Sequence, residues 1–437
     1  MKHTAKWIWF AQKCGAGSSE MVKIYETYGS INDIYLADFN SYIDNDVSER
    51  LAEELSDKSL HDAYSIIKYC EDNGVGILTY ACDEYPQSLR SIKDPPAVLY
   101  YIGRLPDFNK NLCIATVGTR KMSEYGMRSA YKIAYEIASS GAIIVSGMAL
   151  GIDSVAASAA LKAGGKTIAV LGSGIDVIYP KEHKKLYRAI AEKGVVLTEY
   201  PPSTEPHGFN FPVRNRIISG LSQGTVVIDA AENSGALITS KTAILQGRDI
   251  YAVPSNIDSE NASGTNSLIR DGAQAVLCGY DVIKNYAYLF RDTLNIQKLR
   301  MAESKSELDA GALAYYGVRA RGLKPAFEGV SAMAERIKAE ESASKTSDTS
   351  HSKTKRENAP PKKDASADVR GDNSREVLAS LDDYERKIFE EMPLDKAVSA
   401  DYFAANGENL AKAMFALTTL EIKGLVSSLP GALYIRK

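Results

Sequence analysis

The sequence has few of the features that mark metal, disulfide-bonded or membrane proteins. Its five cysteines among 437 residues are widely spaced and contain no CxxC pair, so we expect neither a bound metal nor a disulfide framework. No stretch approaches the roughly 20 consecutive apolar residues of a membrane span. The formal net charge is -3, so nucleic-acid binding would depend on a local basic patch. These absences favour a soluble, cytoplasmic protein with no membrane contact.

The common motifs of nucleotide chemistry are also missing. No GxxxxGK(S/T) loop occurs, and no GxGxxG is followed by an acidic residue about 20 positions later. There is no GxSxG nucleophile elbow. No cluster of histidine, cysteine and carboxylate residues has metal-ligand spacing. We therefore predict no catalytic residues and no cofactor.

The spacing of apolar residues predicts a helical domain followed by an α/β domain. Residues 1–75 carry apolar residues at three- and four-residue intervals, which is typical of short helices. Within residues 76–300, short β-rich runs alternate with amphipathic segments. The expected strands are Cys113–Val117, Ala142–Val145, Thr167–Leu171, Gly194–Leu197, Thr225–Ile228 and Asp249–Val253, and the expected helices are Tyr125–Ser139, Ser154–Ala163, Glu182–Glu192 and Ala236–Gly247. Near-continuous apolar strands between helices predict a doubly wound, Rossmann-like parallel sheet.

The last part of the sequence changes character twice. Residues 301–374 are expected to form a low-complexity flexible linker with partial helix over about 300–340. The stretch 341–372 is polar, has no aromatic residue and cannot offset the entropy of ordering. Periodicity returns over 375–437. There the pattern predicts helices at Asp382–Glu391 and Leu410–Lys423 and a hairpin at Gly424–Ile435, with Pro430 and Gly431 at its turn. Helices followed by a two-stranded wing are typical of a winged-helix domain.

Three glycine turns are expected at one edge of the predicted sheet, where ligands of open α/β sheets bind. They are Val117–Arg120, Ser146–Asp153 and Ser234–Thr239. Glycine permits tight turns and close approach of an anion, and a helix N-terminus adds free N–H groups and partial positive charge. One such turn alone is more often an ordinary strand-to-helix connection. Three together, one of them with Arg120, favour a phosphate site.

Two further segments carry candidate ligand-binding residues. Phe211, Arg214, Asn215 and Arg216 combine an aromatic ring that suits base stacking with groups that suit phosphates. The alternative for this segment is a core phenylalanine and arginines held in structural ion pairs. Lys181 opens a helix-like segment, where a cation is unfavourable unless an anion lies nearby.

The ordered series of these motifs resembles the bacterial DNA-processing protein A family, also called DprA or Smf. The residues that carry the resemblance are Tyr85-Pro86, Asp94-Pro95-Pro96, Val117–Arg120, Ser146-Gly147, Gly151–Asp153, Gly174–Pro180, Thr198–Pro201, Phe211-Pro212, Arg214–Ser222, Ser234–Thr239, Val253-Pro254 and Ser263–Asn266. The resemblance implies an extended Rossmann-like domain with an N-terminal SAM-like helical domain and a C-terminal winged helix. It also implies binding of single-stranded DNA, homodimer formation and loading of the RecA recombinase during natural transformation.

The resemblance also assigns roles to individual residues. Arg120 and Lys181 would hold strand phosphates, and Asn215 with its flanking arginines would line the groove. The full expected DNA-binding set is Gly118, Thr119, Arg120, Ser146, Gly147, Gly151, Lys181, Phe211, Arg214, Asn215, Arg216, Gly235 and Thr239. The chain departs from the family pattern at Leu150, Ala157 and Ser255, where arginine, histidine and glycine are common.

Two alternatives remain open at this point. Glu232 precedes the Ser234-Gly235 turn, an arrangement similar to nucleotide-processing phosphoribohydrolases that combine a glycine-rich turn with a catalytic glutamate. The other alternative is a partner-docking protein whose main functional element is the C-terminal domain, with DNA binding secondary.

Overall fold

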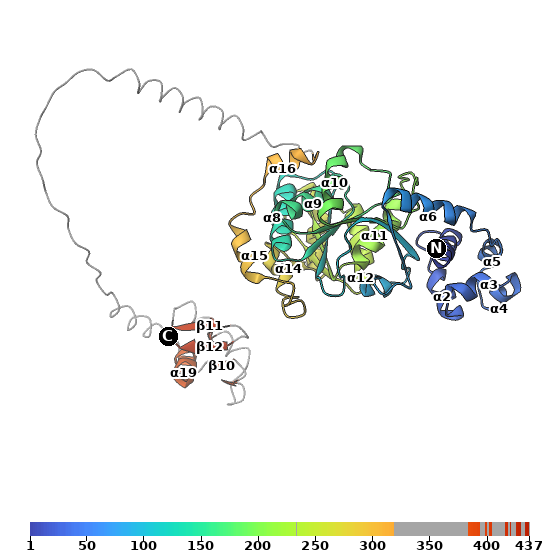
Figure 1. The fold of residues 1–437 in the computed structure, drawn as a ribbon. Coiled ribbons are helices and arrows are strands. Elements are labelled where there is room, and N and C mark those ends of the chain that lie inside the picture. The colour runs from blue at the N-terminus through green and yellow to red at the C-terminus, as the bar shows by residue number, and fades with distance from the viewer. Residues whose placement is uncertain are drawn as a thin grey trace, which may run out of the picture. The chain divides into compact units, whose positions relative to one another are not determined.

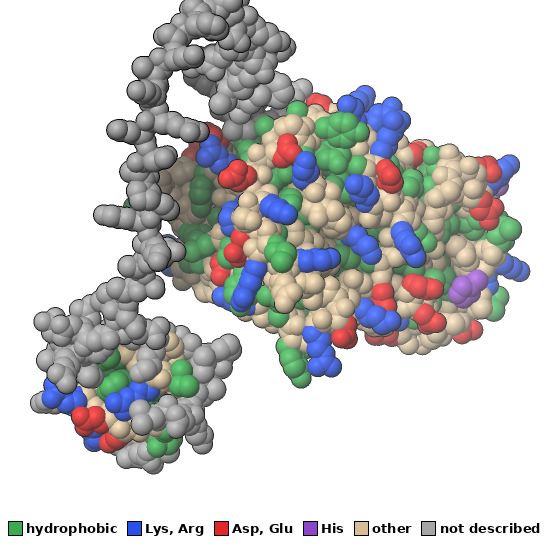
Figure 2. Space-filling model, turned by 60° about the vertical axis from the view of Figure 1, so that its left-hand side comes forward, with side chains coloured by type: hydrophobic (Ala, Val, Ile, Leu, Met, Phe, Trp, Pro, Cys, Tyr) green, Lys and Arg blue, Asp and Glu red, His purple; other side chains and the backbone are tan. Residues whose placement is uncertain are grey.

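The computed structural model describes residues 1–318 except 233, and then 383–393, 398–399, 402–403, 416–417, 420, 425–429 and 433–436. The chain forms two units, Met1–Ser344 and Lys345–Lys437. Among the described residues, no helix combines the length and the apolar composition needed to cross a bilayer. In the space-filling view of Figure 2, lysine and arginine side chains are scattered over the visible face, with acidic and hydrophobic side chains between them.

The first unit begins with the predicted helical domain (Figure 1). Its helices are α1 (Lys2–Cys14), α2 (Glu20–Tyr28), α3 (Ile31–Leu36), α4 (Phe39–Asp44), α5 (Glu49–Ser56) and α6 (His61–Asn73). Side chains cap two of the short ones: Ser30 accepts from the Asp33 N–H, and Asp38 accepts from the Ser41 N–H. Trp7 and Phe10 of α1 are fully buried in the domain core.

A nine-stranded sheet follows, in the order β1-β2-β6-β5-β4-β3-β7-β8-β9. The strands are β1 (Gly76–Thr79), β2 (Val98–Gly103), β3 (Cys113–Gly118), β4 (Ile143–Ser146), β5 (Thr167–Val170), β6 (Val195–Thr198), β7 (Gly224–Ile228), β8 (Asp249–Ala252) and β9 (Gln274–Ala275). The strands from β6 to β9 in this order are parallel, whereas β2 pairs antiparallel with both β1 and β6. All six predicted strands are present, and the predicted doubly wound sheet is confirmed. The antiparallel edge was not predicted.

Helices cover both faces of the sheet. They are α7 (Gln87–Arg90), α8 (Glu124–Ser139), α9 (Ile152–Lys162), α10 (Lys184–Lys193), α11 (Asn210–Gly220), α12 (Gly235–Leu245), α13 (Ser263–Arg270) and α14 (Gly279–Ile283), with a 3-10 turn η1 at Lys181–His183. Alternate residues of β3 enter two different cores. Cys113 and Ala115 pack with the N-terminal domain, α10 and α11, while Ile114 packs with α8, α9 and α14. Burial on both faces explains the near-continuous apolar strands.

The packed unit continues beyond the predicted domain boundary at residue 300. Helices α15 (Ile296–Glu303) and α16 (Ala310–Tyr315) follow α14. Leu299, Leu313 and Val318 are buried in the core beneath α8 and α9. These apolar residues order the first part of the segment that was assigned to a linker. The rest of that segment, 319–374, lies outside the described residues.

The described part of the second unit contains α19 (Asp383–Glu391), β10 (Val398–Ser399), β11 (Val426–Leu429) and β12 (Leu433–Arg436). The strands form an antiparallel sheet in the order β10-β12-β11, with Ser427 opposite Ile435. This confirms the predicted first helix and the hairpin strands of the winged-helix prediction. Most of the predicted helix at 410–423 and the turn at 430–431 lie outside the described residues.

Candidate functional site

A cavity of about 740 Å³ opens at the C-terminal end of β3. The neighbours of β3 are β4 on one side and β7 on the other, so the connections that follow these strands diverge here. We call this cavity the trough. Eight of the predicted site residues line it: Gly118, Thr119, Arg120, Phe211, Arg214, Asn215, Gly235 and Thr239. The glycine turns thus lie at the edge of the sheet where the sequence predicted them.

The turns around the trough are fixed by backbone contacts. The Thr119 N–H donates to the Asp229 carbonyl at 2.9 Å, and the Ile152 N–H donates to the Thr119 carbonyl at 3.2 Å. Gly151 has φ +83°, and a Cβ there would lie 2.3 Å from the Thr119 carbonyl oxygen. Only glycine combines this backbone conformation with this close approach. The floor of the trough is thus held in place before any ligand binds.

Arg120 supplies an exposed cation at the trough. Its guanidinium lies 5.2 Å from the centre of the Phe211 ring. The ring of Tyr179 also packs near Phe211, with ring centroids 5.6 Å apart. Among the described residues, no carboxylate forms an ion pair with Arg120. The guanidinium therefore keeps its hydrogen-bond donors available for an anion.

The N-terminus of α12 faces the same space. Ser234 caps the helix by accepting from the Ala236 N–H at 3.3 Å, and α12 begins at Gly235. A Cβ at Gly235 would meet no atom within 4 Å, and Ser234, Gly235 and Ala236 all line the trough, so this helix end borders the cavity. The first turn of a helix has N–H groups without intrahelical acceptors and carries a partial positive charge. An anion in the trough would meet both.

Arg214 lines the trough but is held by the protein. It is 3% exposed, and its Nη1 donates to the Gly147 carbonyl at 2.9 Å and to the Val170 carbonyl. Burial lowers its pKa to about 10, so it stays charged at neutral pH. Beside it, burial raises the pKa of Asp153, which the positive charge of Arg214 opposes. Arg214 thus offsets the carboxylate in the trough lining and braces the glycine loop.

Five of the thirteen predicted residues do not line the trough, namely Ser146, Gly147, Gly151, Lys181 and Arg216. Ser146 is fully buried, and Gly147 and Gly151 lie in the supporting loop. Lys181 is exposed in η1, just after Tyr179 and Pro180.

Arg216 departs further from the prediction, because it points away from the trough. It is 4% exposed, and its Nη2 lies 2.5 Å from the Glu199 Oε2. Residues two apart on a helix project on different sides, so α11 turns Arg214 and Arg216 in different directions. The alternative of a structural ion pair is therefore the observed arrangement at Arg216.

Some of the trough lining was not predicted. Tyr179 and Ile238 line it and are 42% and 48% exposed. Tyr179 belongs to a motif that carried the family resemblance, which was the available signal for it. Glu232, the candidate catalytic residue of the enzyme alternative, is exposed and is not part of the trough lining.

Comparison with known proteins identifies close relatives. The family model "DNA recombination-mediator protein A" matches residues 76–287. The chain is similar to the DNA processing protein DprA of Bacillus subtilis, with 40% identity over 213 residues, 49% of this chain and 72% of that protein. It is also similar to DprA of Streptococcus pneumoniae, with 44% identity over 206 residues, 47% of this chain and 72% of that protein. The X-ray structure of the Streptococcus pneumoniae protein matches with a TM-score of 0.58 and 35% identity, covering 65% of this chain and 98% of that chain.

Proposed function

Because the chain belongs to the DNA recombination-mediator protein A family, we propose that its trough binds the sugar–phosphate backbone of single-stranded DNA. The observation that carries this proposal is that one cavity is lined both by a guanidinium group and by a helix N-terminus, two groups that attract anions. Arg120 is exposed and forms no ion pair within the part of the chain that the structure describes. The α12 N-terminus lines the cavity at Gly235, where an added Cβ would meet no atom within 4 Å. Both suit phosphate oxygens.

The aromatic side chains favour a single strand over a duplex. Phe211 and Tyr179 line the trough, and Phe209 is 71% exposed close by. Unpaired bases can stack on such rings, whereas the bases of a duplex are already stacked on one another. Phosphate contacts would supply affinity without strong sequence preference.

The wider role rests on family membership. We propose that the bound strand is handed to the RecA recombinase, that the protein acts as a homodimer in the cytoplasm, and that the process serves uptake and recombination of DNA. We also propose that the protein is not an enzyme. This agrees with the position of Glu232, whose side chain is not part of the trough lining.

Fluorescence anisotropy with a labelled oligonucleotide tests the central claim. The single strand should bind more tightly than the matching duplex, and log K should fall linearly with log[salt] at about -0.7 per phosphate contacted. Incubation with nucleoside monophosphates should release no free base. Equal affinity for both forms of DNA, or binding that is insensitive to salt, would contradict the proposal.

A further inference from the structure

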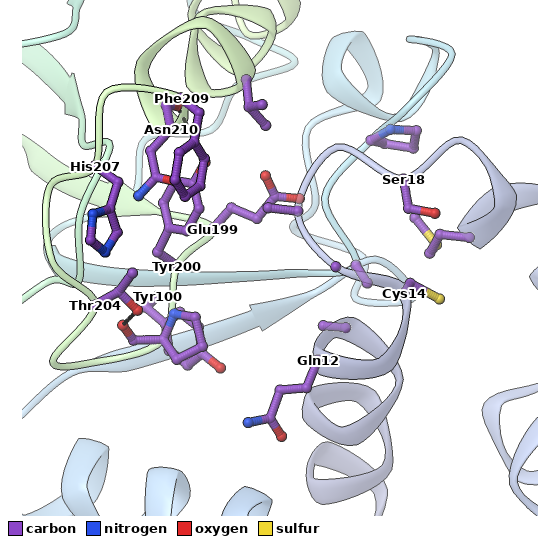
Figure 3. Close-up of a pocket in the computed structure, with 18 residues that line it drawn as sticks. Gln12, Cys14, Ser18, Tyr100, Glu199, Tyr200, Thr204, His207, Phe209 and Asn210 are labelled. Atoms are coloured by element: carbon purple, nitrogen blue, oxygen red, sulfur yellow. Dashed lines mark hydrogen bonds between the residues drawn. The ribbon is translucent and has the colours of Figure 1, made fainter. Parts of the chain in front are cut away.

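A second cavity, of about 510 Å³, lies between the N-terminal helical domain and the sheet domain. Figure 3 shows its two sides: Gln12 and Ser18 come from α1 and the loop after it, while Tyr200, His207 and Phe209 lie opposite. Its volume falls within the range of small-ligand sites, which are mostly apolar with a few polar groups. We call it the domain cavity.

The domain cavity and the trough share one wall. In the segment 206–213, Pro206, Gly208, Phe211 and Pro212 line the trough, while His207, Phe209, Asn210 and Val213 line the domain cavity. A single stretch of chain therefore separates the two spaces. The two cavities thus adjoin along this segment.

The segment that separates the two cavities carries an exposed aromatic pair, His207 and Phe209. Phe209 is 71% exposed, and its ring stacks on His207 with centroids 5.4 Å apart and planes 8° apart. By contrast, the next residue, Asn210, is buried and donates to the Gly172 carbonyl at 3.0 Å. The segment is thus anchored at Asn210 while its aromatic pair lies open to solvent. Apart from this stacking on His207, most of the surface of Phe209 is open to solvent.

The chemistry of the domain cavity suits a base and not a phosphate. Tyr100, Tyr200 and Phe209 contribute aromatic walls, and Gln12, Ser18 and Thr204 contribute polar atoms. No lysine or arginine occurs among the described residues that line it, whereas Arg120 and Arg214 line the trough. A flat, uncharged group with hydrogen-bonding edges fits the first space, and an anion fits the second.

We propose that one base of the bound strand crosses the His207–Phe209 wall and occupies the domain cavity, while its phosphate stays in the trough. This rests on the proposed function, since it requires a strand in the trough. It gives the N-terminal helical domain a direct part in binding, through Gln12 and Ser18. The recognised group is a nucleobase that remains attached to its strand.

The test compares an ordinary oligonucleotide with one of the same length made of abasic sites, which keeps the phosphates and removes the bases. Two variants probe the cavity. Ala16→Trp fills it from the exposed loop after α1, and Phe209→Ala removes the ring of the wall. Ala314→Trp and Tyr288→Ala are matched controls at exposed positions that line neither cavity.

The wild-type protein should bind the ordinary strand at least about 5-fold more tightly than the abasic strand, because base–aromatic stacking adds favourable free energy. Ala16→Trp and Phe209→Ala should each lower this preference to the part that stacking on Phe211 and Tyr179 in the trough supplies, while both controls keep it in full. Ala16→Trp should also leave abasic binding unchanged. Thermal melting checks that each variant is folded. Phe209→Ala removes an exposed side chain, so it keeps the test valid if the tryptophan variant does not fold.

Several results would overturn the inference. If both strands bind with equal affinity, or if Phe209→Ala keeps the full preference for bases, no base occupies the domain cavity. If free 2-aminopurine riboside binds saturably without any strand and Ala16→Trp abolishes this, the cavity serves a free small molecule. If neither strand binds at all, the proposed function fails as well. If both strands bind with an affinity that depends on Arg120 but not on the presence of bases, this inference is refuted while the proposed function stands.

Discussion

Replacement of Arg120 by alanine is the most direct test of the trough. The guanidinium is exposed, contacts the face of Phe211 at 5.2 Å and pairs with no carboxylate of the described chain. Removing it leaves no buried group unpaired, so the free energy of unfolding should change by no more than about 0.5 kcal/mol. The variant should therefore isolate a loss of binding from a loss of folding.

The expected loss of binding follows from one phosphate contact. A hydrogen bond to a charged group contributes about 1.5–3 kcal/mol, which corresponds to about 10- to 150-fold in affinity at low salt. Loss of one phosphate contact should also flatten the log K against log[salt] slope by about 0.7. Arg120→Lys keeps the charge but loses the planar fork, so it should preserve the slope and weaken affinity less.

Fluorescence anisotropy over a salt series measures both quantities. Arg300→Ala is the matched control, because Arg300 is exposed on α15 and lines neither the trough nor the domain cavity. It removes the same charge from the protein as a whole and should leave the slope unchanged. If Arg120→Ala has the slope and affinity of the wild type, or if Arg300→Ala matches its loss, a phosphate contact at Arg120 is refuted.

Three further predictions concern the framework around the trough. Gly151→Ala forces a side chain into a left-handed conformation against backbone and should lower both the melting temperature and strand affinity, whereas Gly235→Ala enters open space and should leave the melting temperature unchanged. Arg216→Met leaves Glu199 buried without its partner and should cost about 3–5 kcal/mol in urea unfolding, and a loss below 1 kcal/mol would contradict the buried ion pair. His183 is fully buried, and burial lowers its pKa from 6.5. The folded state therefore favours the neutral imidazole. The stability that this residue contributes is present above pH 6.5 and is lost as the pH falls through the lowered pKa. Urea midpoints at pH 7.5 and 5.5 should therefore differ less in His183→Gln than in the wild type.

The parallel sheet could be predicted from the sequence because its strands are buried on both faces. Ile114 and Ala115 enter opposite cores, so the strand reads as a continuous apolar run that pattern analysis detects. The antiparallel edge could not be read in this way. The apolar run at Ala97–Ile102 is visible in the sequence, but its direction depends on pairing with β6, nearly 100 residues later along the chain, which no local pattern encodes.

Some positions of the trough residues could also be predicted from the sequence, and others could not. Glycine turns at strand ends and Arg120 were predictable, because parallel strands end at one edge and glycine marks the turns. The different positions of Arg214 and Arg216 could not be predicted, because no helix was assigned to the segment that contains them. A helix there places residues two apart on different sides. Pro212 lies in the first turn of this helix, where proline is tolerated. It was the signal from which a helix, and therefore different directions for the two arginines, could have been predicted.

The position of Arg216 also changes how the boundary at residues 75–76 is understood. The family model begins at 76, yet the helix that carries Phe211 into the trough is tied through Arg216 to Glu199, whose carboxylate also accepts from the Gly17 N–H of the helical domain at 3.3 Å. Apolar residues of both domains form one continuous core beneath this contact. Movement of the helical domain would therefore shift α11 and the trough wall with it. The N-terminal helical domain and the sheet domain therefore pack as one structural unit, although the family model matches only residues 76–287.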